Sequence, residues 1–206
     1  MNTRYRLDCV WTLALVASAV LLAPLAMAQD TDYEGQNKCK MCHNKKSTGE
    51  QWSKWKATKH AIAYETLLTD AAKELSKKVG LETPPAESPE CLRCHVTGYD
   101  PETKTFHPNM AKEDGVQCES CHGRGTKHLA YGKKMLGKDP AESDLPKDIL
   151  RPDSTTCVTC HNEQSPAWNP EKYTLEDGTK VGFDFDQALQ QIAHLNPEKK
   201  REEPKP

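Results

Sequence analysis

Four copies of the pattern Cys-x-x-Cys-His occur in the sequence, at residues 39–43, 91–95, 118–122 and 157–161. In this pattern two thiols can add across the vinyl groups of a haem, while the next residue, histidine, reaches the iron from one face. The sequence therefore predicts four covalently attached c-type haems. The expected attachment residues are Cys39, Cys42, Cys91, Cys94, Cys118, Cys121, Cys157 and Cys160, and the expected proximal iron ligands are His43, His95, His122 and His161.

Paired cysteines two residues apart also build zinc sites and thioredoxin-like redox sites. A zinc ion would use two such pairs and would not require a histidine directly after every second cysteine, whereas all four pairs here have one. An iron–sulfur cluster is also disfavoured, because 47, 22 and 34 residues separate successive motifs and the cysteines of ferredoxins form compact runs. Haem is the favoured interpretation.

The histidines outside the motifs are His60, His107, His128 and His194, one for each motif. A low-spin electron-transfer haem needs a second strong-field ligand on its other face, usually histidine or methionine. These four histidines are therefore candidate distal ligands. Methionine is the weaker alternative, at Met110 or Met135.

Position in the sequence separates the four candidates. His60 shares the apolar face of a predicted helix, and His128 lies in a glycine-rich segment that can fold back over a neighbouring haem. His194 lies near the end of another predicted helix. His107 is the weakest candidate, because Pro108 follows it in a predicted loop.

The sequence predicts a mainly α fold with much irregular loop. Apolar residues recur at three- and four-residue intervals from Gln51 to Val79, where proline and glycine are absent, which predicts one long helix that Gly80 closes. A last helix is expected to begin after Asp184 or Asp186, either of which can cap it, and to run to about Leu195. Turn-forming residues dominate between the second and third motifs, where a short strand pair is the alternative, and residues 139–156 are expected to form a linker.

The chain has few residues that build an apolar core. The mean hydropathy is −0.80, and there are only three phenylalanines. Such a composition is also seen in disordered chains. Four large, mostly apolar haems would resolve the conflict, and the peptide is expected to wrap around them as a multihaem cytochrome c fold.

The two ends of the chain have distinct compositions. Residues 1–28 contain basic residues, an apolar stretch from Val10 to Ala26 and a small-residue cleavage signal, which together predict a secretory signal peptide. The tetrahaem domain is expected to span 29–196, followed by a disordered charged tail at 197–206. Because c-type haems are attached outside the bacterial cytoplasm, a periplasmic or extracellular protein is expected, without an integral membrane span in the mature chain.

The charge balance excludes one class of partner. Without Arg4, Arg6 and Asp8 of the signal peptide, the totals of 28 basic and 30 acidic residues fall to 26 and 29, a net charge of −3. Nucleic-acid binding has no support in that balance. The expected partners are a redox protein that donates electrons and one that accepts them.

Several phrases of the sequence resemble the tetrahaem cytochrome c-554 family, over roughly residues 33–195. They are Glu34-Gly35 before the first motif, Trp52 or Trp55 followed by His60-Ala61, the phrase from Cys94 to Tyr99, and the phrase from Gly115 to Gly125, which is the most specific. The resemblance implies a mostly helical fold with haems stacked in alternating parallel and perpendicular pairs. It also implies distal ligation of the first haem by His128, of the third by His194 and of the fourth by His60, with one face of the second haem open.

The residues leave three possibilities for the distal face of the second haem. It can be open, closed by His107, or closed by a ligand from a neighbouring molecule. The last possibility is found in more distantly similar tetrahaem cytochromes, which polymerise into extracellular filaments. The leading hypothesis is an exported electron carrier. The alternatives are an enzyme acting on nitric oxide or another nitrogen oxide at an open second haem, or a filament subunit that associates with itself.

Overall fold

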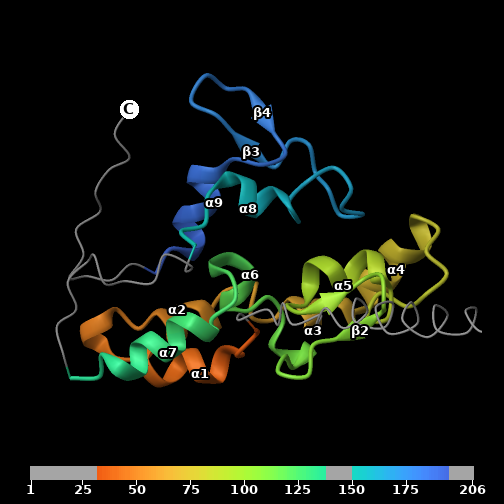
Figure 1. Ribbon diagram of the computed structural model, residues 1–206. Helices are drawn as coiled ribbons and strands as arrows, with labels where there is room; N and C mark the ends of the chain where they lie inside the picture. The colour runs from red at the N-terminus through yellow and green to blue at the C-terminus, as the bar shows by residue number, and fades with distance from the viewer. Residues whose placement is uncertain (1–31, 138–149, 195–206) are drawn as a thin grey trace, which may run out of the picture. The chain divides into compact units, whose positions relative to one another are not determined.

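The computed structural model describes residues 32–137 and 150–194, and helices and irregular loops account for most of them (Figure 1). The helices are α1 (Gln36–His43), η1 (Lys46–Thr48), α2 (Gln51–Lys56), α3 (Ala63–Leu67), α4 (Asp70–Lys78), α5 (Pro89–His95), η2 (Lys112–Asp114), α6 (Cys118–His122), α7 (Thr126–Lys134), α8 (Ser154–Val158) and α9 (Phe185–Ile192). The predicted fold class is confirmed. In the described part of the chain, no helix is both long and apolar enough to cross a membrane.

The single long helix predicted from Gln51 to Val79 is wrong: α2, α3 and α4 divide that stretch. Threonine hydroxyls bond to nearby backbone groups at both breaks. Thr58 Oγ1 donates to the carbonyl of Trp55 at 2.8 Å, and Thr69 Oγ1 donates to the carbonyl of Thr66 at 2.7 Å. Such bonds compete with helix continuation, and Thr69 also caps α4. As a result, His60 lies in the turn between α2 and α3 and not on a helix face.

Two helix ends agree with the sequence. Gly80 follows α4 with φ at 76°, and the amide of Leu81 donates to the carbonyl of Ser76 at 2.9 Å, a six-residue closure typical of glycine-terminated helices. At the start of α9, the Asp184 carboxylate accepts from the amide of Gln187 at 2.9 Å. The predictions that Gly80 ends one helix and that Asp184 or Asp186 caps the last one are confirmed.

The described strands form two short antiparallel hairpins. In the first, β1 (Tyr99–Asp100) pairs with β2 (Thr105–Phe106), in the segment where a strand pair was the alternative to loop. In the second, β3 (Tyr173–Thr174) pairs with β4 (Lys180–Val181). Neither hairpin extends into a larger sheet among the described residues.

The apolar core of the described residues is small. Tyr64 and Leu67 of α3 pack against Leu92 of α5 and Val96 just beyond it, and all four are buried. This apolar cluster is small for a chain of this length, which agrees with the expectation that haems form the rest of the core. The predicted signal peptide at 1–28, most of the linker at 139–156 and the tail at 197–206 lie outside the described residues.

Candidate haem sites

Each Cys-x-x-Cys-His motif begins on a short helix. The helices α1, α5 and α6 end on the motif histidine, and α8 carries the first cysteine of the fourth motif. Residues three and four apart lie on one face of a helix, so both thiols and the imidazole of each helical motif face the same side. The motif cysteines are half-buried. This is the arrangement that a haem with two thioether bonds and a proximal ligand requires.

Three motif histidines lie next to a distal histidine candidate. The ring centroids of His43 and His128 are 5.9 Å apart, those of His122 and His194 are 5.9 Å apart, and those of His60 and His161 are 6.0 Å apart. A metal–imidazole bond is about 2.0 Å long, so two imidazoles on opposite sides of one ion have centroids about 6 Å apart. The three spacings fit an iron between each pair of rings.

His107 does not join any of these pairs. Its Nε2 lies 2.7 Å from Oδ1 of Asp32, its ring lies 5.1 Å from that of Tyr33, and its Nδ1 accepts from the amide of Asn109 at 3.3 Å. Both ring nitrogens are therefore engaged within the chain, including the one that an iron would need. Its ligand role, to the second haem or to a neighbouring molecule, stays a prediction without support from these contacts.

The second site opens into a cavity of about 260 Å³. Cys91, Cys94 and His95 line it on one side, and side chains of α4 such as Ala72 and Leu75 line it on another. Among the described lining residues, only His95 carries an imidazole, and none carries a thioether or an amine. The second site thus has room and a proximal ligand, and its described walls lack a strong distal ligand.

Backbone carbonyls orient several of the imidazoles. His95 Nδ1–H donates to the carbonyl of Ala63 at 2.7 Å, and His122 Nδ1–H donates to the carbonyl of Leu150 at 3.0 Å. Because a carbonyl only accepts, each bond places the proton on Nδ1 and leaves the Nε2 lone pair for iron. Nothing in the sequence pointed to Ala63 or Leu150, since only the folded backbone carries these acceptors.

Burial favours the neutral form of four of the site imidazoles. It is the main reason why the pKa values of His43, His60, His122 and His161 lie below the ordinary histidine value. A neighbouring histidine lowers each of them further, because two adjacent imidazoles disfavour a second positive charge. Only the neutral imidazole has a lone pair for a metal, so the environment suits ligation.

Cysteines of different motifs lie close together. The thiol of Cys39 interacts with that of Cys118, which joins the first site to the third. The thiol of Cys94 interacts with that of Cys160, which joins the second site to the fourth. Burial, together with the nearby thiols of the fourth motif, raises the pKa of Cys121 to about 11. The first site thus lies beside the third and the second beside the fourth, and the fourth motif lies near Cys121 of the third.

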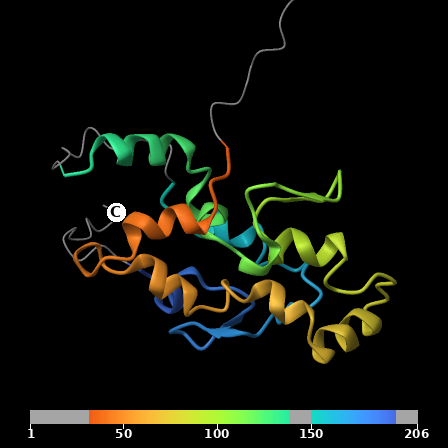
Figure 2. The same ribbon diagram turned by 90° about the horizontal axis from the view of Figure 1, so that it is seen from below.

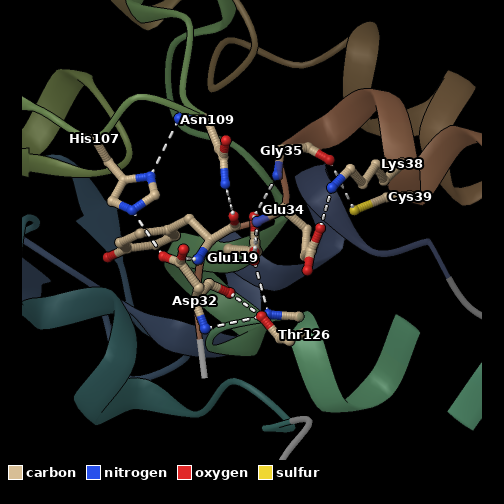
Figure 3. A network of polar contacts seen from close by, with 11 residues as sticks. Asp32, Glu34, Gly35, Lys38, Cys39, His107, Asn109, Glu119 and Thr126 are labelled. Atoms are coloured by element: carbon tan, nitrogen blue, oxygen red, sulfur yellow. Dashed lines mark hydrogen bonds and ion pairs between the residues drawn. The ribbon is translucent and has the colours of Figure 1, made fainter. Parts of the chain in front are cut away.

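A buried carboxylate inside the third motif connects it to the first. Glu119 accepts from the amide of Glu34 at 3.0 Å, from that of Gly35 at 2.9 Å and from that of Gly125 at 2.7 Å (Figure 3). Gln117, which directly precedes the third motif, accepts from the amide of Gln36 at 2.9 Å, at the start of α1. These bonds hold the residues before the first motif against the third. In the sequence, the one sign of this connection is an acidic residue between the motif cysteines. The sequence alone does not show that this residue is buried.

Comparison with known proteins places this arrangement in one family. The sequence profile described as "Cytochrome c554 and c-prime" matches residues 38–123. Cytochrome c-554 of Nitrosomonas europaea is 31% identical over 204 residues, which cover 88% of this chain and 83% of that protein. The chain belongs to the cytochrome c554 family. The solved structure of reduced cytochrome c554 from Nitrosomonas europaea matches 81% of this chain and 86% of that one at 30% identity, with a TM-score of 0.50.

Membership of the cytochrome c554 family confirms several of the expectations. The chain has a multihaem c-type cytochrome fold, and its cofactors are four haem c groups with their irons. It is a c-type cytochrome of electron transfer. The four motifs contain eight thiols and four histidines, the number that four such groups need.

Gly115 positions His60 in this member of the cytochrome c554 family. Its φ is 63°, and an added Cβ would lie 2.5 Å from the carbonyl oxygen of His60. The next amide, of Val116, donates to that same carbonyl at 2.9 Å. A side chain at position 115 would therefore be strained and would push the His60 turn away.

Gly115→Ala should lower the free energy of unfolding of the holoprotein by about 2 kcal/mol or more, because alanine would both adopt a positive φ and meet the His60 backbone. Urea unfolding followed by circular dichroism measures the change. The matched control is Gly132→Ala in α7, where an added Cβ meets nothing within 4 Å and alanine should stabilise the helix by up to about 1 kcal/mol. Equal effects of the two substitutions would show that Gly115 has no special role.

Proposed function

We propose that this cytochrome is an exported protein that moves single electrons between a donor protein and an acceptor protein along the haem order first, third, fourth, second. Each haem c supplies an iron that takes up and releases one electron. The observation that carries the proposal is the packing of the motifs in pairs: Glu119 of the third motif accepts from the amide of Gly35 before the first motif at 2.9 Å, and Arg93 of the second motif donates to Gln164 beyond the fourth at 3.3 Å. Since each motif anchors one haem, this packing favours short distances between the first and third haems and between the second and fourth.

The distal ligands in this proposal are His128 for the first haem, His194 for the third and His60 for the fourth. The support is the centroid distance of 5.9 to 6.0 Å in each histidine pair. Two imidazoles stabilise the ferric state and lower the reduction potential relative to a His/Met pair. The first and second haems are the two ends of the order, so partners would exchange electrons there.

A second candidate function is binding or reduction of a small nitrogen oxide at the second haem. Metal chemistry needs an open coordination position. The cavity beside His95 favours this candidate, because its described walls contain no second imidazole and no thioether or amine. The Nε2 of His107 contacts Asp32 instead. Both functions share the same chain of haems and differ only in what reaches the second iron.

Electron paramagnetic resonance of the ferric holoprotein tests the ligand set. We expect one high-spin haem and three low-spin haems, because three motif histidines have a ring partner and His95 has none among the described residues. The ferrous protein should then bind one carbon monoxide per molecule. Four low-spin signals would remove the small-molecule candidate and leave electron transfer alone.

A further inference from the structure

The helices that build the first haem site carry lysines and no acidic residue. α1 holds His43, α7 holds His128, and α2 packs against α1. In both ribbon views α1 lies next to α2 and α7 (Figure 1 and Figure 2). The lysines of these helices are Lys38, Lys40, Lys54, Lys56, Lys127, Lys133 and Lys134, all exposed.

The adjoining residues reinforce this positive charge. Lys45 and Lys46, between α1 and α2, are exposed as well. Three acidic residues lie close in sequence: Asp32 contacts His107, Glu34 pairs with Lys38, and Glu50 is half-buried. The whole chain has a net charge of −2. The basic face, defined as α1, α2, α7 and the residues between α1 and α2, is thus opposite in sign to the rest of the molecule.

An exposed apolar side chain belongs to the same face. Met41, which lies between the two cysteines that anchor the first haem, is 60% exposed. Next to it in sequence, Lys40 places its Nζ 4.1 Å from the centroid of the Trp52 ring. An apolar centre with charges around it is typical of a transient protein interface, where the charges steer the encounter.

The second haem site, at the other end of the proposed haem order, has an excess of acidic residues, although α4, which lines it, carries Lys73, Lys77 and Lys78 beside Asp70 and Glu74. Residues 82–102 surround the second motif and contain one basic residue, Arg93. The acidic residues of this stretch are Glu82, Glu87, Glu90, Asp100 and Glu102, all exposed. The two ends of the haem order therefore present different charges to incoming partners.

We propose that the basic face is the docking surface for an acidic redox protein, which exchanges electrons with this cytochrome at the first haem. The inference rests on the proposed haem order, in which the first haem is terminal. Charge complementarity selects an acidic partner, because lysines around an exposed apolar centre attract carboxylates and repel basic proteins. An anionic membrane would also attract lysines. A protein is favoured because lipid headgroups neither donate nor accept electrons.

Binding is tested without electron transfer, with the oxidised holoprotein and oxidised flavodoxin, an acidic flavoprotein, as the probe. Lys45→Glu/Lys46→Glu and Lys133→Glu/Lys134→Glu should each weaken binding roughly tenfold at low ionic strength, and high salt should remove the difference. The matched control is Lys77→Glu/Lys78→Glu, because these lysines occupy the last turn of α4 as Lys133 and Lys134 occupy that of α7. Isothermal titration calorimetry measures the affinities. Equal weakening by the control would overturn the proposal, since only net charge would then matter.

Reduction kinetics separate a failure of docking from a failure of electron transfer. Flavodoxin semiquinone passes one electron to a ferric haem, becomes the oxidised flavin and releases its proton to solvent. The basic-face variants should be reduced about tenfold more slowly than the wild type by this probe. They should be reduced as fast as the wild type by lumiflavin semiquinone, which needs no docking surface.

Failure of lumiflavin to reduce the wild-type haems would count against the proposed function itself. Unchanged flavodoxin rates in the basic-face variants would overturn the docking surface alone. Binding to vesicles of phosphatidylglycerol and phosphatidylcholine tests whether the basic face attracts an anionic membrane instead. Loss of vesicle binding in these variants with unchanged flavodoxin affinity would assign the face to a membrane and overturn the proposal.

Discussion

In the ferric His128→Ala holoprotein, the number of high-spin haems should rise from one to two. The His128 ring lies 5.9 Å from that of His43, and alanine leaves the first iron without a sixth ligand. An iron that loses one of two strong-field ligands becomes high-spin and opens to small ligands. Electron paramagnetic resonance counts the high-spin haems, and carbon monoxide uptake by the ferrous protein should double to two per molecule.

Added imidazole should reverse the effect of the His128→Ala substitution. Free imidazole added to His128→Ala should enter the space that the side chain leaves and restore the low-spin signal of the first haem. The matched control is His107→Ala, which removes a histidine that contacts Asp32 and no motif histidine. Its spin states should equal those of the wild type. A new high-spin haem in His107→Ala, with none in His128→Ala, would contradict the proposed ligand pairs.

Glu119→Ala should cause the largest loss of stability, about 3 kcal/mol or more in the free energy of unfolding. The carboxylate is buried and accepts from the backbone amides of Glu34, Gly35 and Gly125. Hydrogen bonds to a charged group contribute about 1.5 to 3 kcal/mol each, and removal of the acceptor leaves buried amides unsatisfied. Urea unfolding of the holoprotein, followed by far-ultraviolet circular dichroism, measures the loss.

Two further variants identify the cause of that loss. Glu119→Gln keeps the shape and one carbonyl oxygen, so it should recover part of the stability, whereas Glu113→Ala, on the exposed side of η2, should change it by less than about 0.5 kcal/mol. If Glu119→Ala is no more destabilising than Glu113→Ala, the carboxylate does not hold the first and third motifs together. The dependence of the unfolding free energy on urea concentration should be the same in all variants. Equal slopes would show that the unfolded states are comparable.

Local patterns predicted the ends of individual elements well. The end of α4 at Gly80 and the cap of α9 at Asp184 depend on residues adjacent in sequence, and both are confirmed. The continuous helix from Gln51 to Val79 failed because its apolar periodicity does not reveal that threonine hydroxyls bond to the backbone at the breaks. The amide of Val116, from a remote segment, also donates to the carbonyl of His60. A pattern of neighbouring residues cannot predict such a bond.

The sequence by itself determined the covalent chemistry of this protein. Two thiols and a histidine within five residues meet one haem through bonds that any short helix or turn can provide, so four motifs sufficed to predict four haem c groups. The residues alone did not pair the distant histidines with motifs: the family resemblance implied the pairs, and only the tertiary structure brings them together, as with His128 beside His43. The tertiary structure also decided that Glu119 is buried and that α7, with its lysines, lies beside the first motif. These features depend on which remote segments pack together, and packing free energy is a property of the whole chain.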